Sequence, residues 1–241
     1  MIIKILKYIF RKLVKKKIFE KDLKKTFTNI YKINYWGDNE SISGPGSNKK
    51  NTANLKKNIG KIIKKFKIKS IVDAPCGDFI WMKKIIVDQK IKYTGIDIVE
   101  ELIKKNNNLY YNKKIKFQKL DITKDILPYS DLFICRDFLF HLSYIDINNF
   151  FKNLSKIKIK FFLTSSHSIS KVNNFIKNKD IISGDFRKIN LFTKPFNFNK
   201  DIKYTIKDNC DGVKKYLLLF EIKKSKELLN FFNLSAIKKY S

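Results

Sequence analysis

The sequence predicts an α/β fold: a doubly wound sheet, mostly parallel, with an antiparallel hairpin at its C-terminal edge. Three observations predict it. Between residues 68 and 165, short apolar runs typical of strands alternate with segments that have the apolar periodicity of helices. The first of these runs ends in a small-residue turn at 73–79 that leads into a helix. The last two apolar runs are joined by "DNCDG" at 208–212, a hairpin-type turn.

Seven strands make up the sheet in this interpretation. We expect them at residues 68–73, 91–97, 115–120, 131–135, 159–165, 202–207 and 215–222. Helices are expected at residues 1–30, 52–67, 79–88, 99–108, 144–157 and 225–233. In the helix at 52–67, for example, Leu55, Ile59 and Ile62 recur on one face. Ser143 is a favourable N-cap for the helix at 144–157.

The chain divides into two parts in this interpretation. Residues 1–50 form a basic amphipathic helix followed by a Gly- and Ser-rich loop, and residues 51–241 carry the sheet. Within the second part, the polar and aromatic segment 166–200 is expected to cover a binding site. A length of 241 residues, 44% of them hydrophobic, fits one α/β domain with additions.

The chain is strongly basic. It has 52 Lys plus Arg against 22 Asp plus Glu, a formal net charge of +30. Most of the positive charge is Lys spread along the whole chain, whereas a specific phosphate-binding surface usually uses Arg. We attribute the charge mainly to compositional bias, with weak binding to polyanions as its by-product. A specific nucleic-acid substrate is not favoured.

Residues 1–25 alternate apolar and basic residues with helical periodicity and contain no uninterrupted apolar run long enough to span a membrane. The sequence leaves three alternatives for the contact that this helix makes: a membrane surface, the rest of the chain or a partner helix. The three cysteines are widely spaced and favour a reducing compartment. We therefore expect a cytoplasmic protein, either free or peripheral to the inner face of the membrane, with no metal site and an undetermined oligomeric state.

Acidic residues end three successive predicted strands. Asp73 and Gly77 lie in the turn after the first strand, Asp97 ends the second and Asp121 follows the third. Ligands of doubly wound sheets bind at this edge, where a carboxylate suits the hydroxyls of a ribose. The turn has neither the G-x-G-x-x-G pattern of dinucleotide folds nor a P-loop sequence. One such acid is a weak signal, but three in succession indicate a nucleoside-binding site.

These motifs resemble those of the class I S-adenosylmethionine-dependent methyltransferases, which have a Rossmann-like fold. "VDAPCGD", "YTGIDI" and "FQKLDI" resemble three successive signatures of that family. The resemblance implies S-adenosylmethionine as cofactor, with Asp97 at the ribose and Asp121 with Ile122 at the adenine. Because Pro75 has no N–H, the amides of residues 76–79 are expected to bind the methionine carboxylate.

Four longer motifs are similar to an uncharacterised bacterial subgroup of these enzymes. They lie at residues 36–47, 73–82, 135–143 and 178–196. In the first, "SISGPGS" is expected to form a lid over the methionine end of the cofactor. The cofactor-binding residues that the resemblance implies are Trp36, Ser43, Gly44, Ser47, Asp73, Ala74, Pro75, Cys76, Gly77, Asp97, Ile98, Asp121, Ile122 and Arg136. An ordinary Gly-Pro connector is the alternative for the lid.

Catalytic residues are expected after the fourth strand, where these enzymes place the methyl acceptor. His141 is the candidate general base, because imidazole accepts a proton near neutral pH, and Asp137 would orient it or the acceptor. His167 is a candidate substrate contact and the second candidate base. Asp180, Arg187 and Asn190, in the covering segment, are candidate substrate contacts. A buried, structural histidine is the alternative for His141.

The sequence thus predicts a methyltransferase that methylates an oxygen of a saccharide or another small molecule. Two other functions remain open: a nucleic-acid (RNA) methyltransferase, and a non-catalytic cofactor-binding protein that serves as an assembly partner.

Overall fold

The computed structural model describes residues 18–86, 91–169, 176–199 and 201–233. Residues 1–17 of the expected N-terminal helix lie outside this set. Seven strands form one sheet: β1 (Ser70–Asp73), β2 (Lys92–Asp97), β3 (Ile115–Lys119), β4 (Ser130–Cys135), β5 (Ile159–Ser166), β6 (Ile202–Lys207) and β7 (Tyr216–Glu221). All seven coincide with the expected strands to within two residues at each end.

The sheet is mostly parallel. Its strand order is β3-β2-β1-β4-β5-β7-β6, and β7 is antiparallel to both of its neighbours. The order reverses between β1 and β4, which makes this the switch point of the sheet. The expected doubly wound sheet with an antiparallel hairpin at its C-terminal edge is confirmed.

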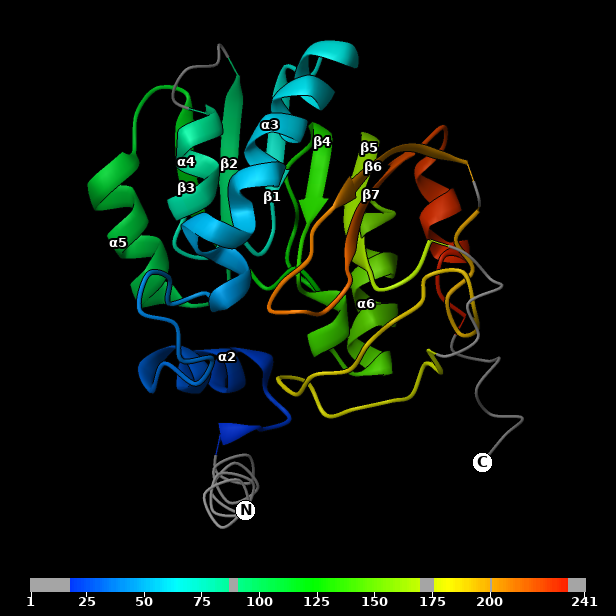
Figure 1. Ribbon diagram of the computed structural model, residues 1–241, viewed down its shortest axis with the longest axis horizontal. Coiled ribbons are helices and arrows are strands. Elements are labelled where there is room, and N and C mark those ends of the chain that lie inside the picture. The colour runs from blue at the N-terminus through cyan, green and yellow to red at the C-terminus, as the bar shows by residue number, and fades with distance from the viewer. Residues whose placement is uncertain (1–17, 87–90, 170–175, 200, 234–241) are drawn as a thin grey trace.

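Helices cover both faces of the sheet (Figure 1). The helices are α2 (Leu23–Lys32), α3 (Lys49–Lys65), α4 (Ile80–Ile86), α5 (Glu100–Tyr110) and α6 (Tyr144–Leu154). Side chains of α3 and α4 pack on one face in a cluster with Ile71, Leu132 and Leu163. Alternate strand residues such as Val72 and Phe133 join α6 in the cluster on the opposite face. The alternation along β1 and β4 therefore buries both faces of the sheet.

The 3₁₀ helices are η1 (Pro45–Ser47), η2 (Leu139–His141) and η3 (Ser225–Asn230). The short C-terminal helix expected at 225–233 is thus a 3₁₀ helix. His141 lies on η2, a helix that the sequence analysis did not expect. α3 begins at Lys49, three residues before the expected start, because Asn48 caps it by accepting a hydrogen bond from the Asn51 amide at 2.9 Å. Ser143 caps α6 as expected.

Helix α2 lies across the edge of the sheet at which the parallel strands end (Figure 1). Asp22 caps it, and Leu23, Phe27 and Ile30 are buried in the same cluster as Phe133. The segment that follows α2 therefore starts next to the carboxyl ends of β1, β2 and β4. This is what brings Trp36 and the "SISGPGS" loop to the candidate site.

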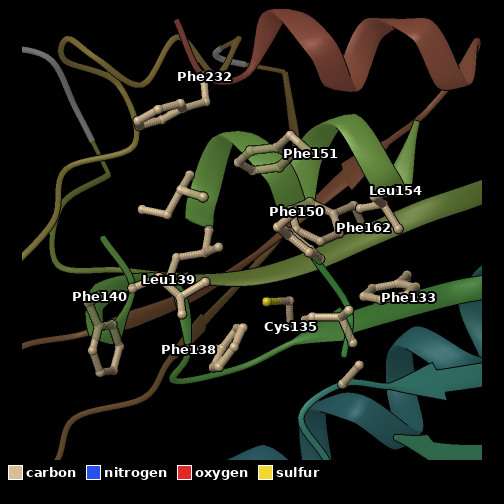
Figure 2. Close-up of a cluster of buried hydrophobic side chains, with 14 of the residues drawn as sticks. Phe133, Cys135, Phe138, Leu139, Phe140, Phe150, Phe151, Leu154, Phe162 and Phe232 are labelled. Atoms are coloured by element: carbon tan, nitrogen blue, oxygen red, sulfur yellow. The ribbon is translucent and has the colours of Figure 1, made fainter. Parts of the chain in front are cut away.

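Phenylalanines dominate the core beneath the end of β4 (Figure 2). Phe150 and Phe151 of α6 contact Phe162 of β5, with ring centroids 6.3 and 6.1 Å apart. Phe133 packs against Phe150 and Phe162. This rigid base fixes the start of the segment 136–141, which carries the candidate catalytic residues.

No helix among the described residues is both long and apolar enough to cross a membrane.

Candidate functional site

Two adjoining cavities open at the carboxyl ends of the parallel strands. The first lies over β1, β2 and β3 beneath α2. Of the cofactor residues expected from the sequence, it is lined by Trp36, Ser43, Ser47, Asp73, Pro75, Cys76, Gly77, Asp97, Ile98, Asp121, Ile122 and Arg136. Ala74 does not line it, and Gly44 lines only the second cavity. Apolar side chains of Phe27, Val99 and Leu102 complete its walls.

The turn after β1 is tightly constrained. Gly77 has φ +56°, and a Cβ atom there would collide with the Ser43 side chain, so the position requires glycine. The amides of Cys76, Gly77, Asp78 and Phe79 donate to Ile96 O, Asp97 Oδ2, Ser43 Oγ and Cys76 O, respectively. All four N–H groups therefore have acceptors within the chain. The expectation that these amides bind the carboxylate of a ligand stays a prediction, and such binding would have to replace these bonds.

The three strand-end acids differ in their surroundings. Asp73 is 1% exposed and accepts a hydrogen bond from Tyr93 Oη at 2.8 Å; burial raises its pKa to about 7. Burial also raises the pKa of Asp97 to about 6, against the opposing effect of amide hydrogen bonds, the first from Val99. Asp121 accepts from the Thr123 hydroxyl at 2.6 Å. Asp97 and Asp121 face the cavity, whereas the Asp73 carboxylate also holds β2 in place through Tyr93.

The "SISGPGS" loop is closed over the boundary between the cavities. Ser41 Oγ and the Ile42 amide donate to Asp78 Oδ2 at 2.7 and 3.1 Å, and Ser43 Oγ accepts from the Asp78 amide. Arg136 Nη2 donates to the Gly46 carbonyl at 2.8 Å. These contacts tie the loop to the turn after β1 and to the end of β4, and its role as a lid stays a prediction.

The second cavity lies beside the first and has a volume of about 540 Å³. Its aromatic walls are Tyr35, Trp36, Phe140 and Phe186, and its polar lining includes His141, His167, Asp137 and Lys215. Four residues line both cavities: Trp36, Ser43, Asp137 and His141. These four side chains therefore surround the junction of the two cavities, where a molecule bound in one cavity can contact a molecule bound in the other.

Four charged side chains cluster beside the junction of the cavities; Arg136, Asp208 and Lys215 are buried, whereas the Asp137 side chain is 22% exposed. Arg136 forms a two-pronged ion pair with Asp208, with Nε–Oδ2 and Nη2–Oδ1 distances of 3.0 and 2.9 Å. Lys215 Nζ contacts both carboxylate oxygens of Asp137 at 2.5 Å and Asp208 Oδ2 at 3.1 Å. Although burial opposes it, the charges of Arg136 and Lys215 hold the pKa of Asp137 well below its usual range. Asp137 is therefore a fixed carboxylate and not a proton acceptor near neutral pH.

Asp208 and Lys215 were not singled out in the sequence. Asp208 follows β6 and Lys215 precedes β7, so the edge hairpin supplies both. Lys215 is 4% exposed, which is rare for a lysine unless it is paired. In a chain with this many lysines, a single buried one carries no distinguishing sequence signal.

His141 faces both cavities. Its Nδ1 lies 2.8 Å from the Asp185 carbonyl oxygen, and its ring packs against Trp36 with centroids 5.5 Å apart. Burial lowers its pKa to about 4, so the ring is neutral near pH 7. This places the predicted base where the cavities meet.

His167 ends β5 and lines only the second cavity. It is 5% exposed, and burial lowers its pKa to about 4. The Ile189 amide donates to its Nδ1 at 3.2 Å. Unlike His141, it does not line the cofactor-side cavity.

Three residues of the covering segment have structural roles. Asp180 accepts from the Tyr144 amide at 2.8 Å, Arg187 donates to the Leu142 carbonyl at 2.5 Å, and the Asn190 side chain accepts from the Phe192 amide at 3.0 Å. None of the three lines either cavity. Asp180 and Arg187 hold the segment against the start of α6 and the end of η2, whereas the Asn190 side chain bonds within the segment. Their role as substrate contacts stays a prediction.

No cluster of three or more His, Cys, Asp or Glu side chains that could hold a metal ion occurs among the described residues. Cys76 is buried, and burial raises the pKa of its thiol. Its environment therefore disfavours the thiolate that a nucleophile would need.

No protein-family model and no curated protein matches the sequence. Solved structures do match the fold. Human N-acetylserotonin methyltransferase in complex with SAM aligns with a TM-score of 0.56 and 12% identity over 81% of this chain; the alignment spans little more than half of that protein, 58%. Magnesium protoporphyrin IX methyltransferase from Synechocystis PCC 6803 with bound SAH aligns with a TM-score of 0.54 and 12% identity, covering 82% of this chain and 98% of that one.

The methyltransferase domain of the bacterial protein CtHen1 is also similar, with a TM-score of 0.52, 13% identity and coverage of 71% and 98%. At such identities these similarities establish the fold: a Rossmann-like sheet of the kind found in methyltransferases.

Proposed function

We propose that this protein is an S-adenosylmethionine-dependent methyltransferase that methylates a hydroxyl oxygen of an uncharged small molecule, with saccharides as the favoured class. The observation that carries the proposal is the meeting of two cavities at His141. One cavity has the strand-end acids of a nucleoside site, and the other has the aromatic and polar lining of an acceptor site. The methyltransferases with similar folds provide independent support for the reaction class.

The residues of the first cavity fit the proposed cofactor. Asp97 would accept hydrogen bonds from the ribose, and Asp121 with the apolar side chain of Ile122 would hold the adenine. Arg136 lines the cavity, and its Nη1 makes no hydrogen bond among the described residues, so it suits the methionine carboxylate. When bound, S-adenosylmethionine supplies an electrophilic methyl group.

The chain itself then has two tasks: to orient the acceptor and to take its proton. His141 is neutral near pH 7, and its Nδ1 is engaged by a carbonyl oxygen, which leaves Nε2 to accept the proton of a hydroxyl group. Asp137 would not act as a second base, because Lys215 occupies both of its oxygens. Trp36 and the closed "SISGPGS" loop would limit the access of water to the junction.

The charge of the acceptor cavity favours an uncharged molecule over a nucleic acid. Although the chain has a formal charge of +30, this cavity is lined by three aspartates, Asp137, Asp185 and Asp211, and by one lysine, Lys215. A phosphate backbone would meet more negative than positive charge there. The RNA methyltransferase alternative is therefore less favoured.

Calorimetry with S-adenosylhomocysteine would test the cofactor assignment. Asp97→Ala should weaken binding by at least about tenfold, because it removes the expected ribose acceptor. Asp201→Ala should leave binding unchanged, because this exposed carboxylate precedes β6, at the edge of the sheet opposite the cavities. Asp97→Asn, which preserves side-chain size, separates loss of binding from loss of folding. Binding of NAD in preference to S-adenosylhomocysteine would contradict the proposal.

Transfer of radiolabelled methyl groups to cell extract would test the acceptor class. We expect label in the saccharide or small-molecule fraction. Label in total RNA alone would favour the RNA methyltransferase. Tight cofactor binding without transfer to any fraction would favour a non-catalytic assembly partner.

A further inference from the structure

The chain contains only two histidines, and both line the acceptor cavity. Both rings pack against the same two phenylalanines. Phe140 lies 4.7 Å from His141 and 5.1 Å from His167 between ring centroids, and Phe186 lies 5.8 and 5.9 Å from them. The histidines come from different elements, His141 from η2 and His167 from the end of β5. Packing against shared rings fixes their positions relative to each other.

The hydrogen bond of His141 determines its tautomer. Nδ1 lies 2.8 Å from the Asp185 carbonyl oxygen, which can only accept, so Nδ1 carries the hydrogen. In a neutral ring, Nε2 is then a bare acceptor. It has no partner among the described residues.

The hydrogen bond of His167 determines the opposite tautomer. The Ile189 amide, which can only donate, points at Nδ1 from 3.2 Å, so Nδ1 is bare and Nε2 carries the hydrogen. The backbone bond from His167 N to Ile189 O, 2.9 Å, makes the arrangement reciprocal and fixes the ring. No acceptor among the described residues meets the Nε2–H. Nε2 is also not one of the fully buried side-chain atoms that lack a partner, so it is open to the second cavity although the residue as a whole is only 5% exposed. A ring N–H in a cavity wall that has no partner in the chain is available to a ligand.

We propose that His141 and His167 form an acceptor–donor pair that selects an uncharged polyhydroxylated acceptor. His141 Nε2 accepts from the hydroxyl group that is methylated, and His167 Nε2–H donates to a second oxygen of the same molecule. This inference rests on the proposed function, because it concerns the acceptor of that reaction. It assigns His167 a positioning role in place of the base that the sequence analysis considered, since an Nε2 that already carries a hydrogen cannot take another from the acceptor.

The rest of the cavity fits such a ligand. Trp36 and Tyr35 offer flat apolar surfaces against which a sugar-like ring can pack. Lys215, the cation in the lining, is already bound to Asp137 and Asp208, which leaves no free positive charge there for an anionic group. A cavity of about 540 Å³ accommodates a single ring with substituents.

Nitrogen-15 NMR of the imidazole groups tests the histidine pair without any cofactor. The pair can therefore be disproved while the proposed methyl transfer stands, and methyl transfer can be disproved while the pair stands. With two histidines in the chain, the spectrum contains two rings, and His141→Gln identifies which is which. At pH 7 we expect both rings neutral, His141 with its hydrogen on Nδ1 and His167 with its hydrogen on Nε2. The same tautomer in both rings, or a protonated ring, would overturn the proposal.

Titration with two uncharged probes then tests selection. Myo-inositol carries a hydroxyl on every ring carbon, and cyclohexanol carries one. Myo-inositol should shift the Nε2 signals of both histidines, whereas cyclohexanol should leave that of His167 in place. If myo-inositol does not move the His167 signal, or if both probes move it equally, the inference is wrong.

Two variants of His167 provide a matched comparison. In His167→Asn, the side-chain oxygen can replace Nδ1 as acceptor for the Ile189 amide, but no donor reaches the position of Nε2. In His167→Gln, the amide nitrogen can reach that position. His167→Asn should weaken myo-inositol binding about tenfold, measured by the His141 signal, and His167→Gln should stay within about threefold of wild type. Equal weakening in both variants would indicate a purely structural histidine.

Discussion

Two side chains that follow β4 share a location but differ in chemistry. Asp137 is clamped by Lys215 and Arg136 and remains ionised, whereas burial keeps His141 neutral. A neutral imidazole with a bare Nε2 can take a proton, and a carboxylate whose oxygens are occupied by an ammonium group is a poor acceptor. The expected help of Asp137 is therefore electrostatic: it keeps Lys215 and Arg136 in place beside the acceptor.

Replacement of His141 tests its role as base. His141→Ala should reduce kcat by about a hundredfold or more, the usual effect of losing a general base, because the acceptor proton then has no acceptor. Cofactor affinity should stay within a few-fold, since Asp97 and Asp121 are unchanged. Single-turnover kinetics and calorimetry measure the two quantities.

The pH dependence of kcat at saturating cofactor provides the second readout for this prediction. Because burial lowers the pKa of His141 to about 4, the base stays deprotonated above that value. The rate should therefore be level between about pH 6 and about pH 8 and fall only toward pH 4. A decrease centred on the ordinary histidine pKa of 6.5, or an unchanged kcat in His141→Ala, would mean that another group takes the proton.

At the scale of elements, the expected lid makes a prediction that can be tested directly. Ser41 Oγ donates to Asp78 at 2.7 Å and accepts from the Ser43 amide at 3.2 Å, and it is 2% exposed. The bond to Asp78 holds a loop before the sheet against the turn after β1, and opening of the loop must break it. The bond from the Ser43 amide lies within the loop.

Ser41→Ala should therefore accelerate release of the cofactor, by about fivefold, since it removes one hydrogen bond worth about 1 kcal/mol that ties the loop to the turn after β1. Stopped-flow dissociation of S-adenosylhomocysteine measures the rate. Ser155→Ala is the control, because that hydroxyl bonds only to the Lys152 carbonyl of its own helix end. Equal rates in wild type and Ser41→Ala would argue for a rigid connector.

The elements themselves were readable from the sequence. Strands such as β2 and β6 follow from apolar alternation and turn residues, and the strand-end acids follow from the strands. What the sequence did not reveal depends on contacts between distant residues. The pairing of Lys215 with Asp137, the bonds of Ser41 and Ser43 to Asp78 and the tautomers of the histidines all arise from tertiary packing. A polar residue that anchors a loop, as Asp180 and Arg187 do, also looks the same in sequence as one that binds a ligand.

For the whole molecule, the net charge is the dominant electrostatic feature. Charges of one sign repel one another in the folded state, and salt screens that repulsion over roughly 10 Å at 0.1 M. We expect the thermal midpoint to rise by roughly 3 to 8 °C between low salt and about 0.5 M NaCl. Differential scanning calorimetry measures it, with sucrose as the uncharged control. A midpoint that falls with salt would mean that attractive ion pairs outweigh the repulsion.

The position of β7 in the sheet also has a consequence for biosynthesis. β7 lies between β5 and β6, so β6 cannot join the sheet until the strand after it has been made. Lys215 and Asp208, which bind the charged groups after β4, belong to this late hairpin. During synthesis, Arg136 and Asp137 therefore lack these ion-pair partners until the hairpin has been made. The second cavity can form only after β7 has joined the sheet. A ribosome-bound chain that ends before Lys215 should already contain the cofactor residues and still lack a place for the acceptor.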